Sequence, residues 1–151
     1  MSKLNFSELK DFLDAKVVQY NIPDFIDSDP LQIPHRYSLK EDIEISGFLT
    51  STIAWGNRKS IINNAKRLMN MMDNAPYEFV MQYQPKDLEP LKSFVHRTFN
   101  GLDCVQFIKS LNHIYTNHNG LEGIFNTYAE AESLQLAIHH LKLSFFEIDH
   151  L

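Results

Sequence analysis

The sequence predicts an all-α protein, an orthogonal bundle of about six to eight helices. Apolar residues recur three and four positions apart along most of the chain, which is the spacing of a helix with one buried face. Polar residues that cap helices precede several of these segments, and no segment shows the apolar–polar alternation of a strand. The 151 residues, 44% of them hydrophobic, suffice for a single helical domain over residues 1–151 without disulfides.

Two segments precede the central helices. A first helix is expected over residues 7–20. The prolines at positions 23, 30 and 34 exclude a long helix in the segment that follows, because proline breaks a helix interior. We therefore expect residues 21–37 to form an ordered loop with one short turn. The apolar stripe of the first helix consists of Leu9, Phe12, Leu13, Val17 and Tyr20.

The clearest helix start is Ser38-Leu39-Lys40-Glu41, a capping box in which the Ser38 and Glu41 side chains can bond each other's backbone amides. The helix that follows is expected to end at Gly56, because glycine readily adopts the left-handed conformation of a C-cap. Asn57 then caps a second helix that runs to about residue 73. The two form a helix–turn–helix pair, a geometry that does not by itself define a DNA-binding motif.

The second half of the chain is also expected to be helical. Pro76 can open a short helix, Pro85 and Pro90 bound another short element, and residues 94–99 are expected to form a loop. Asn100 caps a strong helix that carries Cys104 and Leu111 and ends near Gly120. Two more helices are expected over residues 121–130 and 133–147.

The charge distribution argues against a protein that coats nucleic acid. The chain has 14 basic and 19 acidic residues and a formal charge of −5, whereas coating proteins rely on neutralising phosphates. A local basic patch remains possible, because residues 57–70 contain four cations and no acid. These cations are Arg58, Lys59, Lys66 and Arg67.

Cysteine content and hydropathy predict a cytoplasmic protein that does not enter the membrane. The single cysteine, Cys104, cannot form an internal disulfide, and acidic residues occupy the N-terminus where a signal peptide needs an apolar run. The longest apolar uncharged stretch, residues 45–57, is too short to span a bilayer. The sequence has no glycine-rich phosphate loop, and we expect no cofactor.

Histidines and carboxylates do not indicate a metal or catalytic centre. His113 and His118 are five residues apart and His139 and His140 are adjacent, so neither pair has the helical spacing of metal ligands, and no metal is expected. The carboxylates of Glu41, Asp42 and Glu44 stand at the start of a helix, where they complement its dipole.

Two clusters are candidates for binding nucleic acid or another anion. The segment Ala54-Trp55-Gly56-Asn57-Arg58-Lys59 places the only tryptophan, a tight turn and two cations at a helix N-terminus. In the alternative, Trp55 is a core residue and Arg58 and Lys59 are solvated. The candidate residues here are Trp55, Asn57, Arg58 and Lys59.

The second cluster is Phe94-Val95-His96-Arg97-Thr98-Phe99-Asn100, a loop between two phenylalanines that can present His96 and Arg97. In the alternative, Arg97 pairs with Asp42, Glu44 or Asp103 and ties the loop to the helices. An Arg97→Ala change would then reduce stability.

These clusters, together with three shorter motifs, resemble an uncharacterised bacterial family that is common in Bacteroides-type bacteria and is known as domain of unknown function 2400. The resemblance runs over nearly the whole chain. The shorter motifs are Pro30, Ile33-Pro34-His35 and Asp42-Ile43-Glu44.

The family is distantly similar to helix-hairpin-helix DNA glycosylases. The resemblance implies that residues 42–55 and the turn after them correspond to the start of the glycosylase helical domain. In that turn such enzymes often place a side chain that enters the duplex, which would make Trp55, Asn57 and Arg58 the candidates.

Family members continue past the end of this chain, and their continuation contains a Pro-Leu-Asp-Val-His-like motif where glycosylases keep the catalytic Asp. Nothing matching it occurs before Leu151. The resemblance therefore implies a non-catalytic N-terminal portion of a glycosylase-like DNA-repair fold, with no enzymatic activity expected and DNA as a partner.

The alternative to this DNA-related function is a helical protein-interaction or structural module.

Apolar residues continue to the end of the chain, so we also expect a homodimer, or aggregation, through the C-terminal helix. Its stripe is Leu134, Ala137, Ile138, Leu141 and Phe145, with Phe146, Ile148 and Leu151 beside it.

Overall fold

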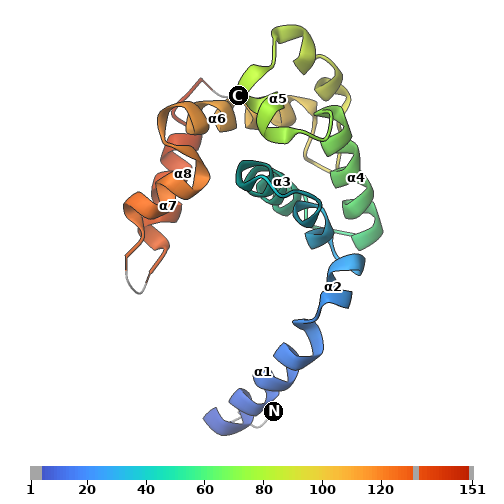
Figure 1. The fold of residues 1–151 in the computed structure, drawn as a ribbon, viewed down its shortest axis with the longest axis vertical. Coiled ribbons are helices and arrows are strands. Elements are labelled where there is room, and N and C mark those ends of the chain that lie inside the picture. Colours follow the sequence, from blue (N-terminus) through green and yellow to red (C-terminus); the bar gives the residue numbers. More distant parts are fainter. Residues whose placement is uncertain (1–4, 131–132, 150–151) are drawn as a thin grey trace.

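The computed structural model describes residues 5–130 and 133–149, and this part of the chain is all-α (Figure 1). Eight α-helices and four short 3₁₀ helices make up its regular structure, joined by loops. In chain order they are α1 (Phe6–Tyr20), α2 (Pro23–Ser28), η1 (Pro30–Gln32), η2 (Pro34–Arg36), α3 (Lys40–Thr52), α4 (Arg58–Met71), α5 (Pro76–Gln82), η3 (Pro85–Leu88), η4 (Pro90–Ser93), α6 (Gly101–Asn117), α7 (Gly120–Tyr128) and α8 (Gln135–Phe145).

Asparagine caps start two of the central helices, as the sequence predicts. The Asn57 side chain accepts a hydrogen bond from the Ser60 amide, 3.2 Å away, at the start of α4. Asn100 accepts from the Leu102 amide at 2.8 Å and forms a reciprocal capping box with Asp103 at the start of α6. Each cap satisfies amides that have no partner within the helix.

Proline positions explain why residues 21–37 are more helical than expected. All six prolines of the chain occupy the first turn of a helical segment, and Pro23, Pro30 and Pro34 open α2, η1 and η2. Proline lacks an amide hydrogen, which the first turn does not need, and its fixed φ suits that position. The expected loop is therefore a series of three short helices.

Two predicted boundaries of α3 are wrong. The backbone is still extended at Tyr37 and α3 starts at Lys40 with Leu39 as its N-cap, so Ser38 stands too far from the first amides to form the expected capping box. At the other end α3 stops at Thr52. Gly56 does have the positive φ expected of it, 111°, but it lies in the loop that leads to α4.

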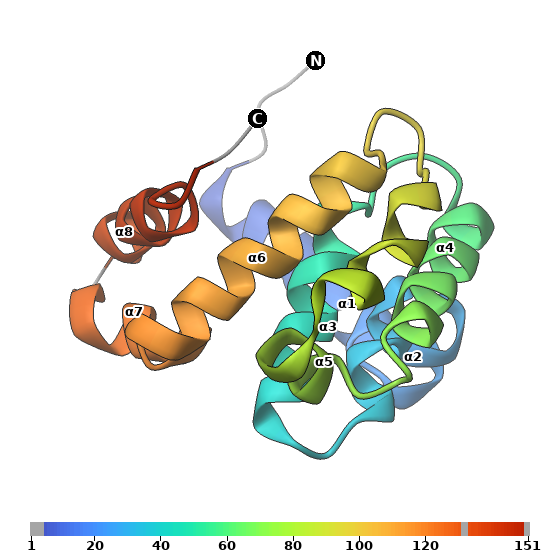
Figure 2. The same ribbon diagram turned by 90° about the horizontal axis from the view of Figure 1, so that it is seen from above.

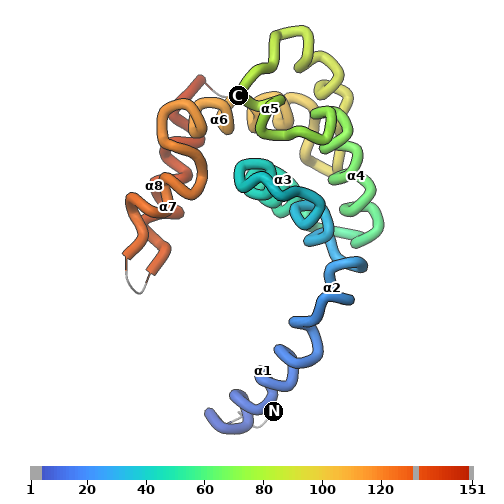
Figure 3. Tube along the Cα trace, viewed as in Figure 1, coloured from blue at the N-terminus to red at the C-terminus, as the bar shows by residue number. Residues whose placement is uncertain are grey.

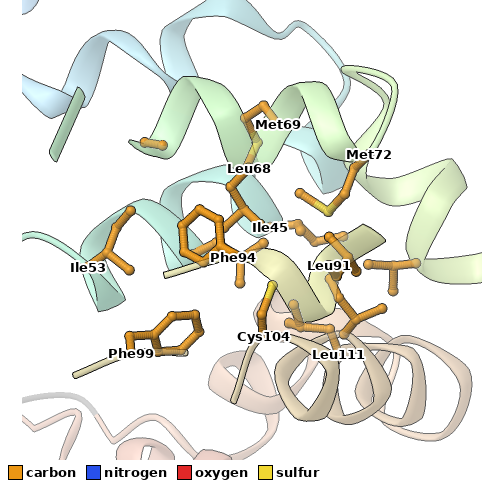
Figure 4. Packing of buried hydrophobic residues seen from close by; sticks show 14 of the residues in the cluster. Ile45, Ile53, Leu68, Met69, Met72, Leu91, Phe94, Phe99, Cys104 and Leu111 are labelled. Atoms are coloured by element: carbon orange, nitrogen blue, oxygen red, sulfur yellow. The ribbon is translucent and has the colours of Figure 1, made fainter. Parts of the chain in front are cut away.

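The core lies between α3, α4, η4 and α6 (Figure 4). Phe94, the largest of the fully buried side chains, enters it from the segment just after η4 and meets Phe99 edge-on, with ring centroids 6.1 Å apart. Cys104 of α6 is buried there too, and burial raises the pKa of its thiol to about 12, which makes it unreactive at neutral pH.

The acidic residues at the start of α3 connect this helix to its neighbours. The Asp42 carboxylate accepts a hydrogen bond from the backbone amide of Tyr77 at 2.8 Å, which supplies the cap that α5 lacks in its own sequence. Glu44 accepts from the Tyr115 hydroxyl of α6 at 2.6 Å. Both carboxylates therefore hold helices together, and burial with this hydrogen bond raises the pKa of Tyr115.

The two ends of the chain are less enclosed than the centre. The helix predicted for residues 7–20 is present as α1, but it buries none of its residues and extends away from the body (Figures 1 and 3). At the C-terminal end α7 and α8 pack against each other beside α6 (Figure 2). Of the stripe expected on α8, Ala137 and Phe145 are buried, whereas Leu134 and Ile138 are exposed; Leu151 lies outside the described residues.

No helix in the described ranges combines the length and the apolar character needed to cross a membrane.

Gly101 sets how closely α6 approaches η4. A Cβ at this buried position would lie 2.0 Å from the Lys92 carbonyl oxygen, so only glycine permits the contact. We predict that Gly101→Ala lowers the free energy of unfolding by about 1–3 kcal/mol, because backbone must move to admit the methyl group. Chemical denaturation would measure the change.

Gly47→Ala is the matched control. Gly47 lies inside α3, and its Cβ would make an ordinary 3.8 Å contact with Pro34. Alanine is the better helix former by about 0.5–1 kcal/mol, so this variant should be neutral or more stable. Equal stability of the Gly101→Ala variant and the wild type would contradict the close packing of α6 on η4.

Candidate nucleic-acid interface

The turn between α3 and α4 and the segment between η4 and α6 meet at one surface. The first carries Trp55 and Gly56, and the second carries His96 and Arg97. The Gly56 φ of 111° turns the chain there, and a Cβ at this residue would lie 2.8 Å from a guanidinium nitrogen of Arg97. Sequence segments about 40 residues apart thus form one site, which we call the Trp55–Arg97 surface: Trp55, Gly56, His96 and Arg97.

His96 is an interior residue of this site. Its side chain is only 2% exposed, and both ring nitrogens have partners. The Asn64 amide nitrogen of α4 lies 2.8 Å from Nδ1, and Nε2 lies 3.3 Å from the Trp55 carbonyl oxygen. With Asn64 donating to Nδ1, the neutral imidazole donates from Nε2 to Trp55. His96 therefore positions the turn, and it cannot contact a ligand directly.

Trp55 lies on the surface. Its side chain is 38% exposed, and its ring meets the His96 ring edge-on with centroids 5.9 Å apart. The guanidinium carbon of Arg97 stands 4.8 Å from the centre of the indole, within the range of a cation–π interaction. A flat apolar ring and a cation thus face solvent together.

Arg97 is held in an unusual backbone conformation. It has a φ of 58°, in the left-handed region that residues with a side chain seldom adopt. Two backbone hydrogen bonds between His96 and Phe99, 2.8 and 3.0 Å long, close the tight turn around it. The buried Phe94 and Phe99 anchor the segment on both sides, so this turn presents Arg97 outward at a local cost in strain.

The carboxylate expected to pair with Arg97 is not there. Asp42 bonds the Tyr77 amide, Glu44 bonds Tyr115, and Asp103 caps α6 through the Asn100 amide. Among residues 5–130 and 133–149, the ion pairs involve other cations. The prediction that Arg97 contacts one of these three acids is therefore wrong, and its guanidinium stays available on the surface.

The remaining candidates occupy the first turn of α4. The Asn57 side chain is engaged as the helix cap. Arg58 is 58% exposed, with a loose contact of 3.9 Å to Asp29 and its guanidinium 6.0 Å from the Phe25 ring. Lys59 is exposed. The structure brings Trp55, His96 and Arg97 into contact and leaves Arg58 and Lys59 as flanking cations.

A shallow apolar hollow of about 210 Å³ adjoins this turn. Ala54, next to Trp55, lines one side of it, and Thr50 of α3 lines another. The Thr50 hydroxyl is buried and has no hydrogen-bond partner within the described ranges, although buried hydroxyls usually have one. Thr50 therefore lines the hollow, while its hydroxyl is enclosed by the protein.

Sequence reasoning missed Asn64 and the arrangement of two histidines. Asn64 stands among the polar residues of α4, and nothing in its neighbourhood indicates a bond to His96, 32 residues away. The prediction that His113 and His118 do not easily converge, because they are five residues apart, is wrong. Both Nε2 atoms lie close to the same Glu147 oxygen, at 2.9 and 3.4 Å.

The fold and site define an all-α protein with an aromatic–cation surface at the junction of α3, α4 and α6. The chain belongs to the family of proteins of unknown function DUF2400, whose model matches residues 29–151. The match includes the whole Trp55–Arg97 surface and leaves out α1. No curated protein and no solved structure matches the chain.

We predict that Arg97→Gly changes the free energy of unfolding by less than about 1 kcal/mol. Glycine relieves about 1–2 kcal/mol of left-handed strain. Against this stand a cation–π contact of about 0.5–1 kcal/mol and the greater freedom of glycine in the unfolded chain, about 0.4–1 kcal/mol. Thermal and chemical denaturation would measure the difference.

Arg97→Ala is the comparison variant. It keeps the left-handed backbone strain at position 97 and loses the cation–π contact, so we expect it to be less stable than Arg97→Gly. A loss of more than about 2 kcal/mol in the glycine variant would indicate a buried ion pair of Arg97 and contradict this description.

Proposed function

We propose that this chain binds nucleic acid through the Trp55–Arg97 surface, with Arg58 and Lys59 as flanking phosphate contacts. In this proposal it is the non-catalytic part of a glycosylase-like fold of the DNA-repair type. The resemblance to helix-hairpin-helix glycosylases supports a DNA role. The proposal assigns binding and no catalysis, because His96 is buried and both of its ring nitrogens are engaged.

One observation carries the proposal: an exposed arginine, with no ion pair to any residue that the structure describes, is held over an exposed tryptophan by a strained turn. Strained backbone is usually retained where function needs it. An exposed indole is a surface on which a nucleobase stacks. The cations beside it, Arg97 included, contact the phosphates, so the combination suits a single strand or an unpaired base.

The apolar hollow beside the turn favours unpaired nucleic acid over a regular duplex. A base that leaves the stack needs an apolar space with a polar group for its edge. The hollow supplies the apolar space. We therefore expect single-stranded DNA to bind more tightly than a duplex of the same sequence.

The acidic surroundings limit the affinity. Asp29 lies 3.9 Å from Arg58 and competes with phosphate for it, and the whole chain carries a formal charge of −5. Binding without sequence preference typically has a dissociation constant of about 1–100 µM at physiological salt. We expect values towards the weak end of that range, and tighter binding at low salt.

The test is the binding of a fluorescent single-stranded oligonucleotide, followed by anisotropy at several salt concentrations. With Arg58, Lys59 and Arg97 each contacting one phosphate, log K should fall with log salt with a slope of about −2. Arg97→Gly should weaken binding and reduce the slope by about 0.7, because one phosphate contact is lost while the fold is retained.

Lys109→Gln is the control, because it removes one exposed charge from the middle of α6, away from this surface. It should bind as the wild type does. No binding at low salt would contradict the proposal, as would an equal effect of the Lys109 and Arg97 variants, which would indicate that only total charge matters.

A protein-interaction role is the second candidate, and the exposed apolar residues of α8 favour it. Leu136 and Leu143 stand two helical turns apart and are 41% and 52% exposed, and Leu134 and Ile138 are exposed as well. Exposed apolar residues gathered on one helix typically mark an association surface. We propose that a second copy of the chain covers this helix.

We predict that light scattering finds a dimer at about 100 µM chain, because burying a leucine is worth about 1.5–3 kcal/mol. Leu143→Glu should shift the chain to monomer, and Leu102→Glu, which alters an equally exposed leucine at the start of α6, should not. A wild-type monomer at this concentration would contradict self-association through α8.

A further inference from the structure

Three side chains, two from α6 and its C-cap and one from the segment after α8, meet at the C-terminal end of α6. His113 lies in the last turns of α6, His118 is its C-cap, and Glu147 follows the end of α8. The Glu147 Oε2 atom is 2.9 Å from His113 Nε2 and 3.4 Å from His118 Nε2. The three ligand-type atoms all lie within 4.8 Å of one another.

The end of α6 explains how two histidines five residues apart converge. On a continuous helix, positions five apart point about 140° away from each other. His118 stands where α6 stops, and its φ of −123° and ψ of 14° differ from helical values. Its ring therefore turns back towards His113, with ring centroids 5.3 Å apart. Glu147 then reaches both rings because α8 ends beside α6.

We propose that His113, His118 and Glu147 form a binding site for a divalent transition-metal ion of the zinc type. Two imidazole nitrogens and one carboxylate are a ligand set that zinc uses, with a fourth position left for water. The site lies within the family match, at the opposite end of α6 from the Trp55–Arg97 surface, and it does not depend on the proposed nucleic-acid role.

The two distances to Glu147 suit this ion, and the ligand atoms of the two histidines lie within 4.8 Å of each other, so they would move closer together as the ion binds. Zinc–ligand bonds of about 2.0–2.1 Å in a tetrahedron place ligand atoms about 3.3–3.4 Å apart. The contacts of 2.9 and 3.4 Å to Glu147 are close to that separation, and both involve the same carboxylate oxygen. A hard cation such as Mg²⁺ prefers oxygen ligands and should not select two imidazoles.

The environment also suits a metal. The two histidine side chains are partly buried, 20% and 29% exposed, and Glu147 is open to solvent, so an ion can enter. The Asn117 side-chain amide nitrogen lies 3.0 Å from His113 Nδ1. When Nε2 binds the ion, Nδ1 carries the proton, so the amide would turn its oxygen towards Nδ1 to accept from it.

The bound ion would have a structural role. It would join α6 directly to the segment after α8, and through the C-cap of α6 it would fix the start of α7. An ion that binds only the folded site stabilises the native state by RT ln(1 + c/Kd), where c is the concentration of free ion. The bound ion would stabilise helix α8 most, because this helix buries few of its own residues.

The experiment is a titration of Zn²⁺ into the whole chain, prepared without a histidine tag and freed of metal by a chelator. Isothermal titration calorimetry should show one ion per chain. Thermal denaturation at Zn²⁺ ten times the dissociation constant should show a Tm higher by about 3–6 °C. Mg²⁺ at the same concentration should leave Tm unchanged.

Glu147→Gln and His118→Asn should each weaken zinc binding by more than about tenfold, because each removes a direct ligand. His139→Ala, which removes an exposed histidine of α8 outside the cluster, is the matched control and should bind as the wild type does. Circular dichroism of the metal-free variants confirms that they remain folded.

Absence of saturable zinc binding by the wild type would overturn the proposal. So would binding that the two ligand variants retain or that His139→Ala removes, since other histidines would then hold the ion. Neither result bears on oligonucleotide binding, which involves the other end of α6.

Discussion

The buried imidazole of His96 is the contact on which the proposed surface depends. It accepts from Asn64 of α4 and donates to the Trp55 carbonyl, so it fixes the turn after α3 against the segment before α6. A buried imidazole with an unsatisfied nitrogen would cost about 1–3 kcal/mol, which favours the one arrangement in which both are bonded. Trp55 and Arg97 lie outside this buried ring and are exposed.

Close packing behind this contact gives it rigidity. Gly101 lets α6 touch the backbone of η4, and Phe94 and Phe99 enter the core on either side of His96. The short turn between the two phenylalanines has little freedom, so the strain at Arg97 is supported by aromatic burial. In contrast, α1 and the outer face of α8 carry apolar residues that the chain leaves exposed, and those parts have no comparable constraint.

Local signals predicted the helices better than the site. Asn57 and Asn100 cap the helices they were expected to cap, because capping depends on residues three positions apart. Contacts between distant segments were not predictable in the same way. Arg97 was expected to pair with an acid, but the three candidate carboxylates had other partners, and His118 turned towards His113 because α6 ends there. Such outcomes depend on the tertiary arrangement, which periodicity does not encode.

The fluorescence of Trp55 tests the central claim most directly, because it is the only tryptophan of the chain and lies in the proposed surface. A base that stacks beside the indole changes its emission. Titration with a single-stranded oligonucleotide at low salt should quench the emission saturably, with the same midpoint as the anisotropy of the labelled strand. Binding seen by anisotropy without any change in the emission of Trp55 would place the nucleic acid elsewhere and contradict the account.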